Sequence, residues 1–236
     1  MSDSKNFFHM NVTPVKTGST AERLKYNHRS GKYAKKGDLL AAGAENMPEG
    51  MDPKVFFDTL DGHERRNGGA IDTKVALPRV LKPDQQAALA RKLALMLAGE
   101  SPVAWAVHCP KAALEGGDQP HLHALICGRV PDGIDRPVEQ IFKRYNPAAP
   151  KNGGWRKDSG GPTYRAVTER LREQRRKTSE LVNEHLRRHG HSQQVDHRSH
   201  KDRGDAAVPG KHLGPKRVWS QVQEQEPALV VRYLWE

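Results

Sequence analysis

The stretch that decides the fold of this chain runs Gln119-Pro120-His121-Leu122-His123-Ala124-Leu125-Ile126-Cys127. An apolar run of this length, in which polar and apolar side chains alternate at the start, predicts a β-strand. Successive side chains of a strand point to opposite faces, so His121 and His123 share one face and Leu122 lies on the other. The strand therefore presents two imidazoles to one side and an apolar surface to the other.

A third histidine ends the preceding apolar run, Val103–His108. We expect the two runs to pair as an antiparallel hairpin, which brings His108 close to His121 and His123. Three converging imidazoles can hold a divalent metal ion and leave coordination positions open, as a catalytic centre requires. Because a single strand histidine is usually packed or solvated, the predicted metal site depends on all three side chains meeting.

The composition of the chain predicts one sizeable domain with a polyanionic partner. Its 236 residues fit one sizeable domain with a tail, or two small ones, and a hydrophobic share of 36% favours a single core with long loops. The formal net charge of +11 favours nucleic acid over a membrane, because no segment approaches the roughly 18–20 apolar residues needed to span a bilayer. With no signal-peptide pattern and two cysteines, a reducing cytoplasm is the expected compartment.

Periodicity and capping signals predict the remaining elements. Strands are expected over residues 6–14, 70–77, 103–108 and 121–127, and helices over 20–29, 53–64, 83–98 and 162–189. Ser19 and Glu22 fit a capping box at the start of the first helix. The order of elements predicts an α+β fold, an antiparallel β-sheet with helices packed on its faces. The last helix is strongly basic, which fits a solvated face or a phosphate-binding one equally well.

Tyr26 lies late in the first expected helix, surrounded by basic residues. Further short motifs follow along the chain: Lys16-Thr17-Gly18-Ser19, Gly31-Lys32-Tyr33, Met47-Pro48-Glu49, Ala76-Leu77-Pro78, Asp84-Gln85-Gln86, Ala88-Leu89-Ala90, Asp132-Gly133-Ile134-Asp135-Arg136-Pro137, Phe142-Lys143-Arg144-Tyr145-Asn146, Asp196-His197-Arg198-Ser199 and His212-Leu213-Gly214-Pro215. Together with the histidine motif, this ordered set resembles the MobA/MobL family of plasmid mobilisation relaxases, which are HUH endonucleases. The resemblance covers roughly residues 8–218. It implies a relaxase domain over residues 1–218, with an HUH relaxase-like sandwich fold, and a C-terminal tail over 219–236.

The resemblance also implies roles for individual residues. Tyr26 matches the nucleophile, and the three histidines match the metal ligands, for which the family implies Mg²⁺ or Mn²⁺ although imidazole ligands alone would favour Zn²⁺. Asp72 matches an acidic position that polarises the active site. Lys74 stands where a second carboxylate is sometimes found, which leaves the general base open. Tyr33 matches a second tyrosine, taken here as structural or as a DNA contact.

The activity implied by the resemblance is nicking of one DNA strand at a plasmid transfer origin. Attack by the tyrosine oxygen leaves a 5′-phosphotyrosine and a free 3′-hydroxyl, and the reverse reaction rejoins the strand after transfer. A phenol, with an ordinary pKa of about 10, needs activation for this attack. The neighbouring basic residues would attract the phosphate and contact DNA; they are Arg23, Lys25, Arg29 and Lys32. The implied partners are single-stranded DNA at the origin, accessory relaxosome proteins and a coupling protein, with no membrane insertion.

Other functions fit parts of the pattern. A rolling-circle replication initiator or a single-strand transposase would share the histidine and tyrosine chemistry, but in many of these the tyrosine follows the histidine pair, whereas here it precedes it. A non-catalytic basic DNA-binding protein would explain the charge alone. A structural zinc site could use the later histidines, which are His185, His189, His191, His197, His200 and His212. Aromatic side chains could stack on bases, although a place in the core is the stronger expectation for each candidate; the candidates are Trp105, Tyr145 and Trp155.

Overall fold

The computed structural model describes residues 8–65, 69–111 and 117–204. Within them the chain forms two compact units. The first contains the described residues of 8–109 and 120–197, and the second contains those of 110–119 and 198–204. The predicted boundary at residue 218 and the predicted tail lie outside the described residues.

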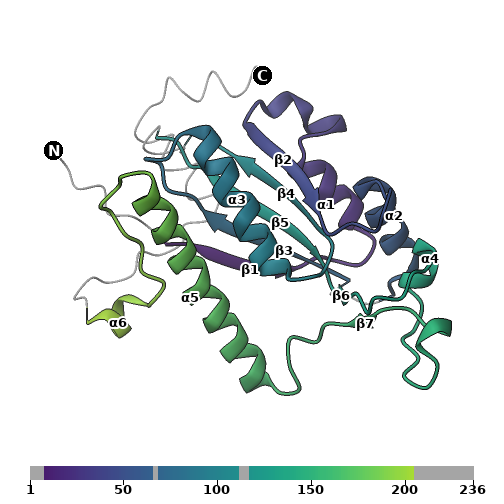
Figure 1. Ribbon diagram of the computed structural model, residues 1–236. Helices are drawn as coiled ribbons and strands as arrows, with labels where there is room; N and C mark the ends of the chain where they lie inside the picture. The colour runs from purple at the N-terminus through teal and green to yellow at the C-terminus, as the bar shows by residue number, and fades with distance from the viewer. Residues whose placement is uncertain (1–7, 66–68, 112–116, 205–236) are drawn as a thin grey trace, which may run out of the picture. The chain divides into compact units, whose positions relative to one another are not determined.

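A five-stranded sheet forms the centre of the first unit (Figure 1). Its strands, in spatial order, are β1 (Met10–Pro14), β3 (Ala70–Ala76), β5 (His121–Cys127), β4 (Val103–His108) and β2 (Leu39–Glu45). Every neighbouring pair is antiparallel. The predicted α+β class is therefore confirmed, and the histidine-bearing β5 is the central strand of the sheet.

Helices cover both faces of this sheet. The helical segments of the first unit are α1 (Thr20–Asn27), η1 (Gly31–Lys36), α2 (Pro53–His63), α3 (Pro83–Ala98), α4 (Val138–Ile141), η2 (Pro150–Asn152) and α5 (Tyr164–Arg188). On one face, α3 and α5 pack Leu89, Leu93 and Leu186 against Val107 and Leu122. On the other face, α1, α2 and α4 belong to a second core cluster with Leu125 of β5. No helix in the described part of the chain has the length and apolarity to cross a bilayer.

Strand β2 is absent from the elements that the sequence predicts. Its residues, Leu39–Glu45, include three alanines and a glycine, which have low strand propensity. The reason for the glycine is tertiary. Gly43 pairs with Trp105 of β4, and a Cβ on Gly43 would lie 2.8 Å from the indole ring. Glycine at this position lets the indole ring pack closely on the backbone of β2.

The start of α1 also differs from the prediction. The Ser19 side chain makes no capping hydrogen bond, so the predicted capping box is wrong. Instead, Asp61 of α2 accepts hydrogen bonds from the backbone N–H groups of Thr20 (3.0 Å) and Ala21 (2.8 Å). Glu22 faces Lys32 and the hydroxyl of Tyr33. The cap therefore comes from a neighbouring helix about 40 residues away in the sequence.

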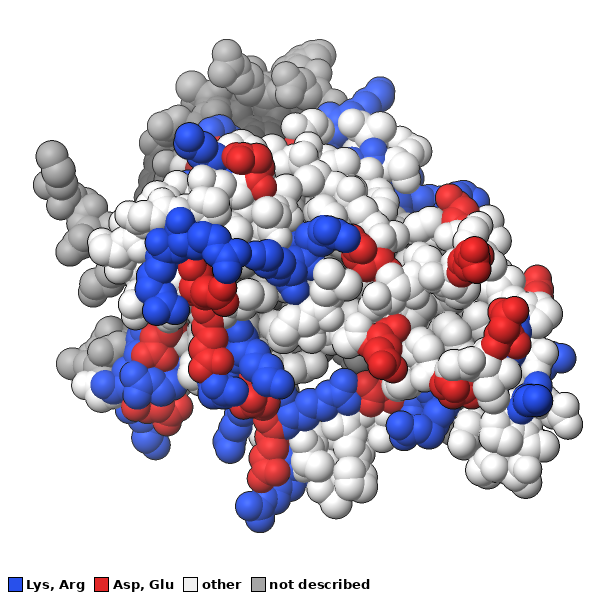
Figure 2. All heavy atoms as spheres, in the orientation of Figure 1, with Lys and Arg blue, Asp and Glu red and all other residues white. Residues whose placement is uncertain are grey.

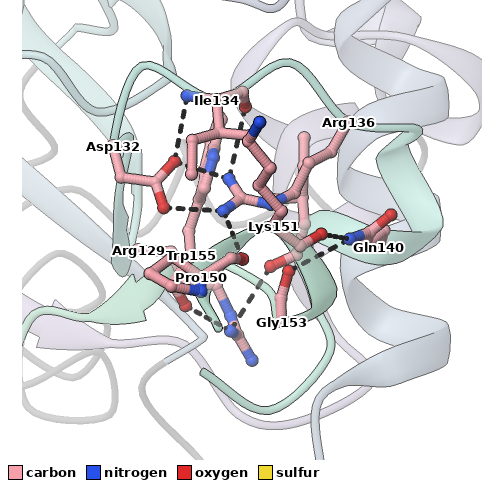
Figure 3. Close-up of polar contacts among 10 residues, drawn as sticks. Arg129, Asp132, Ile134, Arg136, Gln140, Pro150, Lys151, Gly153 and Trp155 are labelled. Atoms are coloured by element: carbon pink, nitrogen blue, oxygen red, sulfur yellow. Dashed lines mark hydrogen bonds and ion pairs between the residues drawn. The ribbon is translucent and has the colours of Figure 1, made fainter. Parts of the chain in front are cut away.

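Two buried arginines hold the irregular segment 129–157. Arg129 pairs with Glu64 and donates to the carbonyl oxygens of Lys143 (2.9 Å) and Trp155 (2.7 Å). Figure 3 shows the guanidinium of Arg136 between the Asp132 carboxylate (2.5 and 2.7 Å) and a carbonyl oxygen of the next loop. The segment also contains a two-stranded sheet of β6 (Arg129–Val130) and β7 (Arg156–Lys157). Donation to backbone carbonyls fixes these loops, and α4 and Trp155 pack into the second core cluster.

Helix α5 carries acidic as well as basic side chains along its exposed surface. Figure 2 shows blue and red groups interleaved over this helix. Arg170 pairs with Asp158 (2.6 Å), Arg188 with Glu184 (2.6 Å) and Arg165 with Glu169 (2.8 Å). These acidic partners match part of the positive charge of α5.

The second unit contains an ion pair and one short helix. Lys111 and Asp118 form an isolated β-bridge and an ion pair of 2.5 Å. Helix α6 (His200–Arg203) begins after Ser199, whose hydroxyl oxygen accepts from the Asp202 backbone N–H at 3.2 Å.

Candidate metal centre

The sheet brings the three predicted histidines together on the face covered by α1 and α2. His108, the last residue of β4, pairs with His121, the first residue of β5, and His123 lies two residues further along. The ring centroids of His108 and His123 are 4.8 Å apart, and that of His121 lies 5.5 and 5.2 Å from them. One ligand atom from each residue lies within 4.8 Å of the others. Among the described residues this is the one such cluster of histidine, cysteine or acidic side chains.

Asp72 of β3 orients His123. The Asp72 carboxylate accepts a hydrogen bond from Nδ1 of His123 at 3.2 Å. That bond places the imidazole proton on Nδ1, and His123 Nε2 is buried with no protein partner. Burial alone would raise the pKa of Asp72, but His123 and Arg23 lower it below its ordinary value. Metal-binding histidines usually donate one ring N–H to a carboxylate and bind the metal through the other nitrogen. His123 and Asp72 have this arrangement, so these residues fit a divalent cation.

His108 is fixed as a neutral imidazole. Its Nε2 lies 2.6 Å from the backbone oxygen of Asn27, and its Nδ1 lies 3.1 Å from a guanidinium nitrogen of Arg29. A carbonyl only accepts and a guanidinium only donates, so Nε2 carries the proton and Nδ1 is the acceptor. Burial, only partly offset by the bond to Asn27, lowers the pKa of His108 to about 4. The ring is therefore neutral at physiological pH, as a metal ligand must be.

Tyr26 lies beside this cluster, on the last turn of α1. Its half-buried ring meets the rings of His108 and His123 edge to face, each at a centroid distance of 6.0 Å. The guanidinium carbon of Arg29 lies 4.5 Å from the ring centroid, and Lys36 Nζ lies 5.3 Å from it. The structure thus places the predicted tyrosine next to the predicted histidines, with cationic groups around its ring.

The four predicted DNA-binding residues lie in different surroundings. Lys25 and the more exposed Lys32 pair with Glu22 at 3.9 and 2.5 Å. Arg23 is partly exposed and lies 3.6 Å from Asp72. Arg29 is buried, with 5% of its side chain exposed. The first three remain predicted DNA contacts, whereas Arg29 contacts the site from inside the protein.

Two residues of the site were not predicted from the sequence. Asn27 accepts from His108 through its backbone and donates to Asp72 through its side chain at 3.4 Å, so it connects two of the predicted residues. Asp38, just before β2, binds Arg29 with both oxygens, at 2.5 and 2.7 Å. Asn27 could have been suspected from the sequence, because it directly follows Tyr26. Asp38 could not, because its position depends on strand β2, which the sequence does not predict.

The other candidate aromatics and histidines have structural surroundings. Trp105 and Trp155 are buried in the two core clusters, and Tyr145 is 36% exposed. His185 lies 3.0 Å from the backbone oxygen of Gln85, and His197 contacts Ser179. His212 lies outside the described residues. These contacts give no support to a zinc site built from the later histidines within the described part of the chain.

The fold and the site together define an α+β sheet protein in which three converging imidazoles, supported by a carboxylate, face a tyrosine. Residues 15–223 of the chain match the sequence model of the MobA/MobL family. The chain is 37% identical over 219 residues to Mobilization protein A of Escherichia coli, covering 89% of this chain and 30% of that protein. It is 36% identical over 203 residues to the 43 kDa relaxation protein of Salmonella typhimurium, covering 84% of this chain and 55% of that protein.

The chain therefore belongs to the MobA/MobL family. It spans about half or less of the length of these two relatives. Its fold is similar to that of a solved structure from work on the molecular basis of vancomycin resistance transfer in Staphylococcus aureus, with a TM-score of 0.60 and 21% identity. That similarity covers 82% of this chain and 100% of the other.

Proposed function

We propose that this chain is a conjugative DNA relaxase that nicks one strand at a plasmid transfer origin and rejoins it after transfer. The Tyr26 hydroxyl gives up its proton as its oxygen attacks a phosphodiester, the bond between phosphorus and the 3′-oxygen breaks, and the 5′-phosphate stays on the tyrosine. The released 3′-oxygen takes up a proton. Because the phosphotyrosine conserves the ester bond, a 3′-hydroxyl can attack it in turn and reseal the strand without ATP.

The observation that carries this proposal is the Tyr26 ring, 6.0 Å from two imidazoles of the three-histidine cluster. The family membership of the chain supports the same reading. His108, His121 and His123 are the proposed metal ligands, and Asp72 holds His123 with Nε2 directed away from the carboxylate. When bound there, a divalent cation, Mg²⁺ or Mn²⁺ by family resemblance and Zn²⁺ by ligand chemistry, would neutralise charge on the phosphate oxygens.

The basic side chains on and after α1 are the proposed contacts to the DNA backbone. Arg23, Lys25 and Lys32 lie on the same short segment as Tyr26 and are at least partly exposed. Single-stranded DNA is the proposed substrate, because the reacting phosphate must enter the site with its flanking bases apart. We assign this activity to the domain of residues 1–218, acting in the bacterial cytoplasm with accessory relaxosome proteins and a coupling protein.

The decisive experiment mixes the protein with single-stranded DNA from the transfer origin of its own plasmid, with Mn²⁺, with Mg²⁺ or with chelator. We expect an SDS-resistant protein–DNA adduct that requires metal and maps to Tyr26 by mass spectrometry. Tyr26→Phe should abolish the adduct and keep the DNA affinity, because it removes one oxygen only. Tyr33→Phe is the matched control and should retain cleavage.

Two results would contradict the proposal. An adduct that survives in Tyr26→Phe and disappears in Tyr33→Phe would move the nucleophile to the second tyrosine. DNA binding without an adduct, across a tiled set of origin sequences and both metals, would make the chain a DNA-binding protein without catalysis. A preference for replication-origin or transposon-end DNA over transfer-origin DNA would instead favour the initiator or transposase alternative.

A further inference from the structure

Arg29 occupies a backbone position that normally requires glycine. Its φ of 49° lies in the left-handed region. The backbone N–H of Ser30 donates to Lys25 (2.9 Å), and that of Arg29 donates to Tyr26 (3.3 Å). This pair of bonds is the Schellman end of a helix, where the left-handed residue is usually glycine because a Cβ is strained there by roughly 1–2 kcal/mol. Strain of this kind, next to a candidate site, indicates that the side chain is needed.

The guanidinium of Arg29 is held by four separate groups. Asp38 binds it with both oxygens, at 2.5 and 2.7 Å, and the backbone oxygen of Tyr26 accepts from it at 3.0 Å. The same planar group lies over the Tyr26 ring at 4.5 Å and donates to His108 Nδ1 at 3.1 Å. The register of β2 against β4 explains the geometry, because it pairs Leu39 with His108 and so brings Asp38 beside that ring. These contacts of Arg29, which we call the Arg29 clamp, therefore join the end of α1, the start of β2 and the end of β4.

The contact with His108 has a consequence for metal binding. A neutral imidazole has one lone pair in its ring plane, and in His108 that pair lies on Nδ1, because Nε2 donates its proton to Asn27. Arg29 already donates to Nδ1. A divalent cation that takes His108 as a ligand through this nitrogen must therefore displace one N–H of a guanidinium, and must approach a fixed positive charge.

We propose that Arg29 is a positioning residue that competes with the divalent cation for His108. The guanidinium holds the imidazole in place, and a divalent cation bound through His108 Nδ1 would free one of the guanidinium N–H groups beside Tyr26, where negative charge would develop during strand transfer. Only the role of the freed N–H group in strand transfer rests on the proposed function. The competition itself concerns the histidine cluster and requires no DNA.

The test is a titration of the full chain with Mn²⁺ in the absence of DNA. Binding is measured by calorimetry or by the electron paramagnetic resonance signal of free Mn²⁺. Arg29→Gly suits the left-handed backbone and removes the guanidinium, so it should fold and bind Mn²⁺ roughly tenfold more tightly, the size expected for losing a hydrogen bond to a charged group. Arg29→Lys keeps the charge without the planar guanidinium, and its Mn²⁺ affinity should lie between those of the wild-type chain and Arg29→Gly. Lys36→Gln removes a nearby charge that no observed bond links to His108, and should change the Mn²⁺ affinity less than twofold.

Unchanged or weaker Mn²⁺ binding by Arg29→Gly would overturn the proposal and make Arg29 a purely structural clamp. If the wild-type chain binds too weakly to measure, binding gained by Arg29→Gly supports the competition and binding by neither chain refutes it. Adduct formation at saturating Mn²⁺ is the second readout, and Arg29→Gly should be slower there despite its tighter metal binding. Should the wild-type chain form no adduct while the shift in Mn²⁺ affinity persists, the relaxase proposal fails and the competition stands.

Discussion

Acid should destabilise this protein through His108 in a pH window that the structure defines. His108 is fully buried, and its Nδ1 faces the guanidinium of Arg29. Burial lowers its pKa from an ordinary 6.5 to about 4, so the unfolded chain binds a proton there at a higher pH than the folded chain does. The free energy of unfolding is therefore unaffected by this residue above about pH 6.5, falls as the pH drops towards 4, and becomes level below that.

The interval between these two pKa values corresponds to about 3 kcal/mol of unfolding free energy. A loss of that size is a large fraction of the 5–15 kcal/mol roughly typical of a folded domain. Two other histidines contribute in the same direction, since burial also lowers the pKa of the half-buried His28 and of the buried His185. The contribution of His108 must therefore be isolated by comparison with a variant.

The variant is His108→Asn, whose amide oxygen can accept from Arg29 but takes up no proton. Urea denaturation of both chains at pH 7.5 and pH 4.5, with chelator present to exclude competition between metal and proton, gives the comparison. We expect the wild-type chain to lose about 2 to 3 kcal/mol more than the variant between these pH values. Equal losses by the two chains, or a smaller loss by the wild type, would refute the description of His108 as a buried neutral ring.

Three further predictions concern residues around the site. Asp72→Asn should weaken Mn²⁺ binding about 10- to 100-fold, because the amide no longer orients a ligand imidazole, while Asp58→Asn on the surface of α2 should not; equal affinities would remove Asp72 from the metal centre. Gly43→Val should destabilise the fold by about 1–3 kcal/mol in thermal denaturation, because its Cβ would lie 2.8 Å from Trp105, and an unchanged Tm would contradict that packing. Asp61→Ala should cost about 1 kcal/mol and speed amide exchange in the first turn of α1, and unaltered exchange there would show that the cap is dispensable.

Much of the site could be read from the sequence because it depends on local periodicity. The alternation along residues 121–127 determines which side chains share a face, and two histidines on one strand cannot be separated by any tertiary arrangement. The antiparallel pairing that brings His108 to them follows from two neighbouring apolar runs. The helix over 83–98 was predicted to the residue, since Pro83 starts it and Gly99 ends it.

The remaining features depend on contacts between distant residues. Asp61 caps a helix that begins 41 residues earlier, and no local signal replaces that contact. Strand β2 has an unfavourable composition, and it is held by its pairing with β4, where the indole of Trp105 covers Gly43. A left-handed arginine at a helix end contradicts the rule that such positions are glycine, so Arg29 looked like one more surface cation. Each of these misses arises where tertiary packing overrides local propensity.

The strand order β1-β3-β5-β4-β2 also bears on how the protein folds. Both margins of the sheet, β1 and β2, come from the first 45 residues, whereas its three inner strands come from residues 70–127. His108 pairs with His121 within the β4–β5 hairpin, whereas the pairings of β1, β2 and β3 join residues much farther apart in the sequence. Because pairings between distant residues form slowly, we expect the β4–β5 hairpin to form first and the other strands to join it later. Tyr26 lies between β1 and β2 in the sequence, so it reaches the histidines only after the hairpin that carries them has formed. A partly folded chain would then bring the three imidazoles together before the tyrosine is in place.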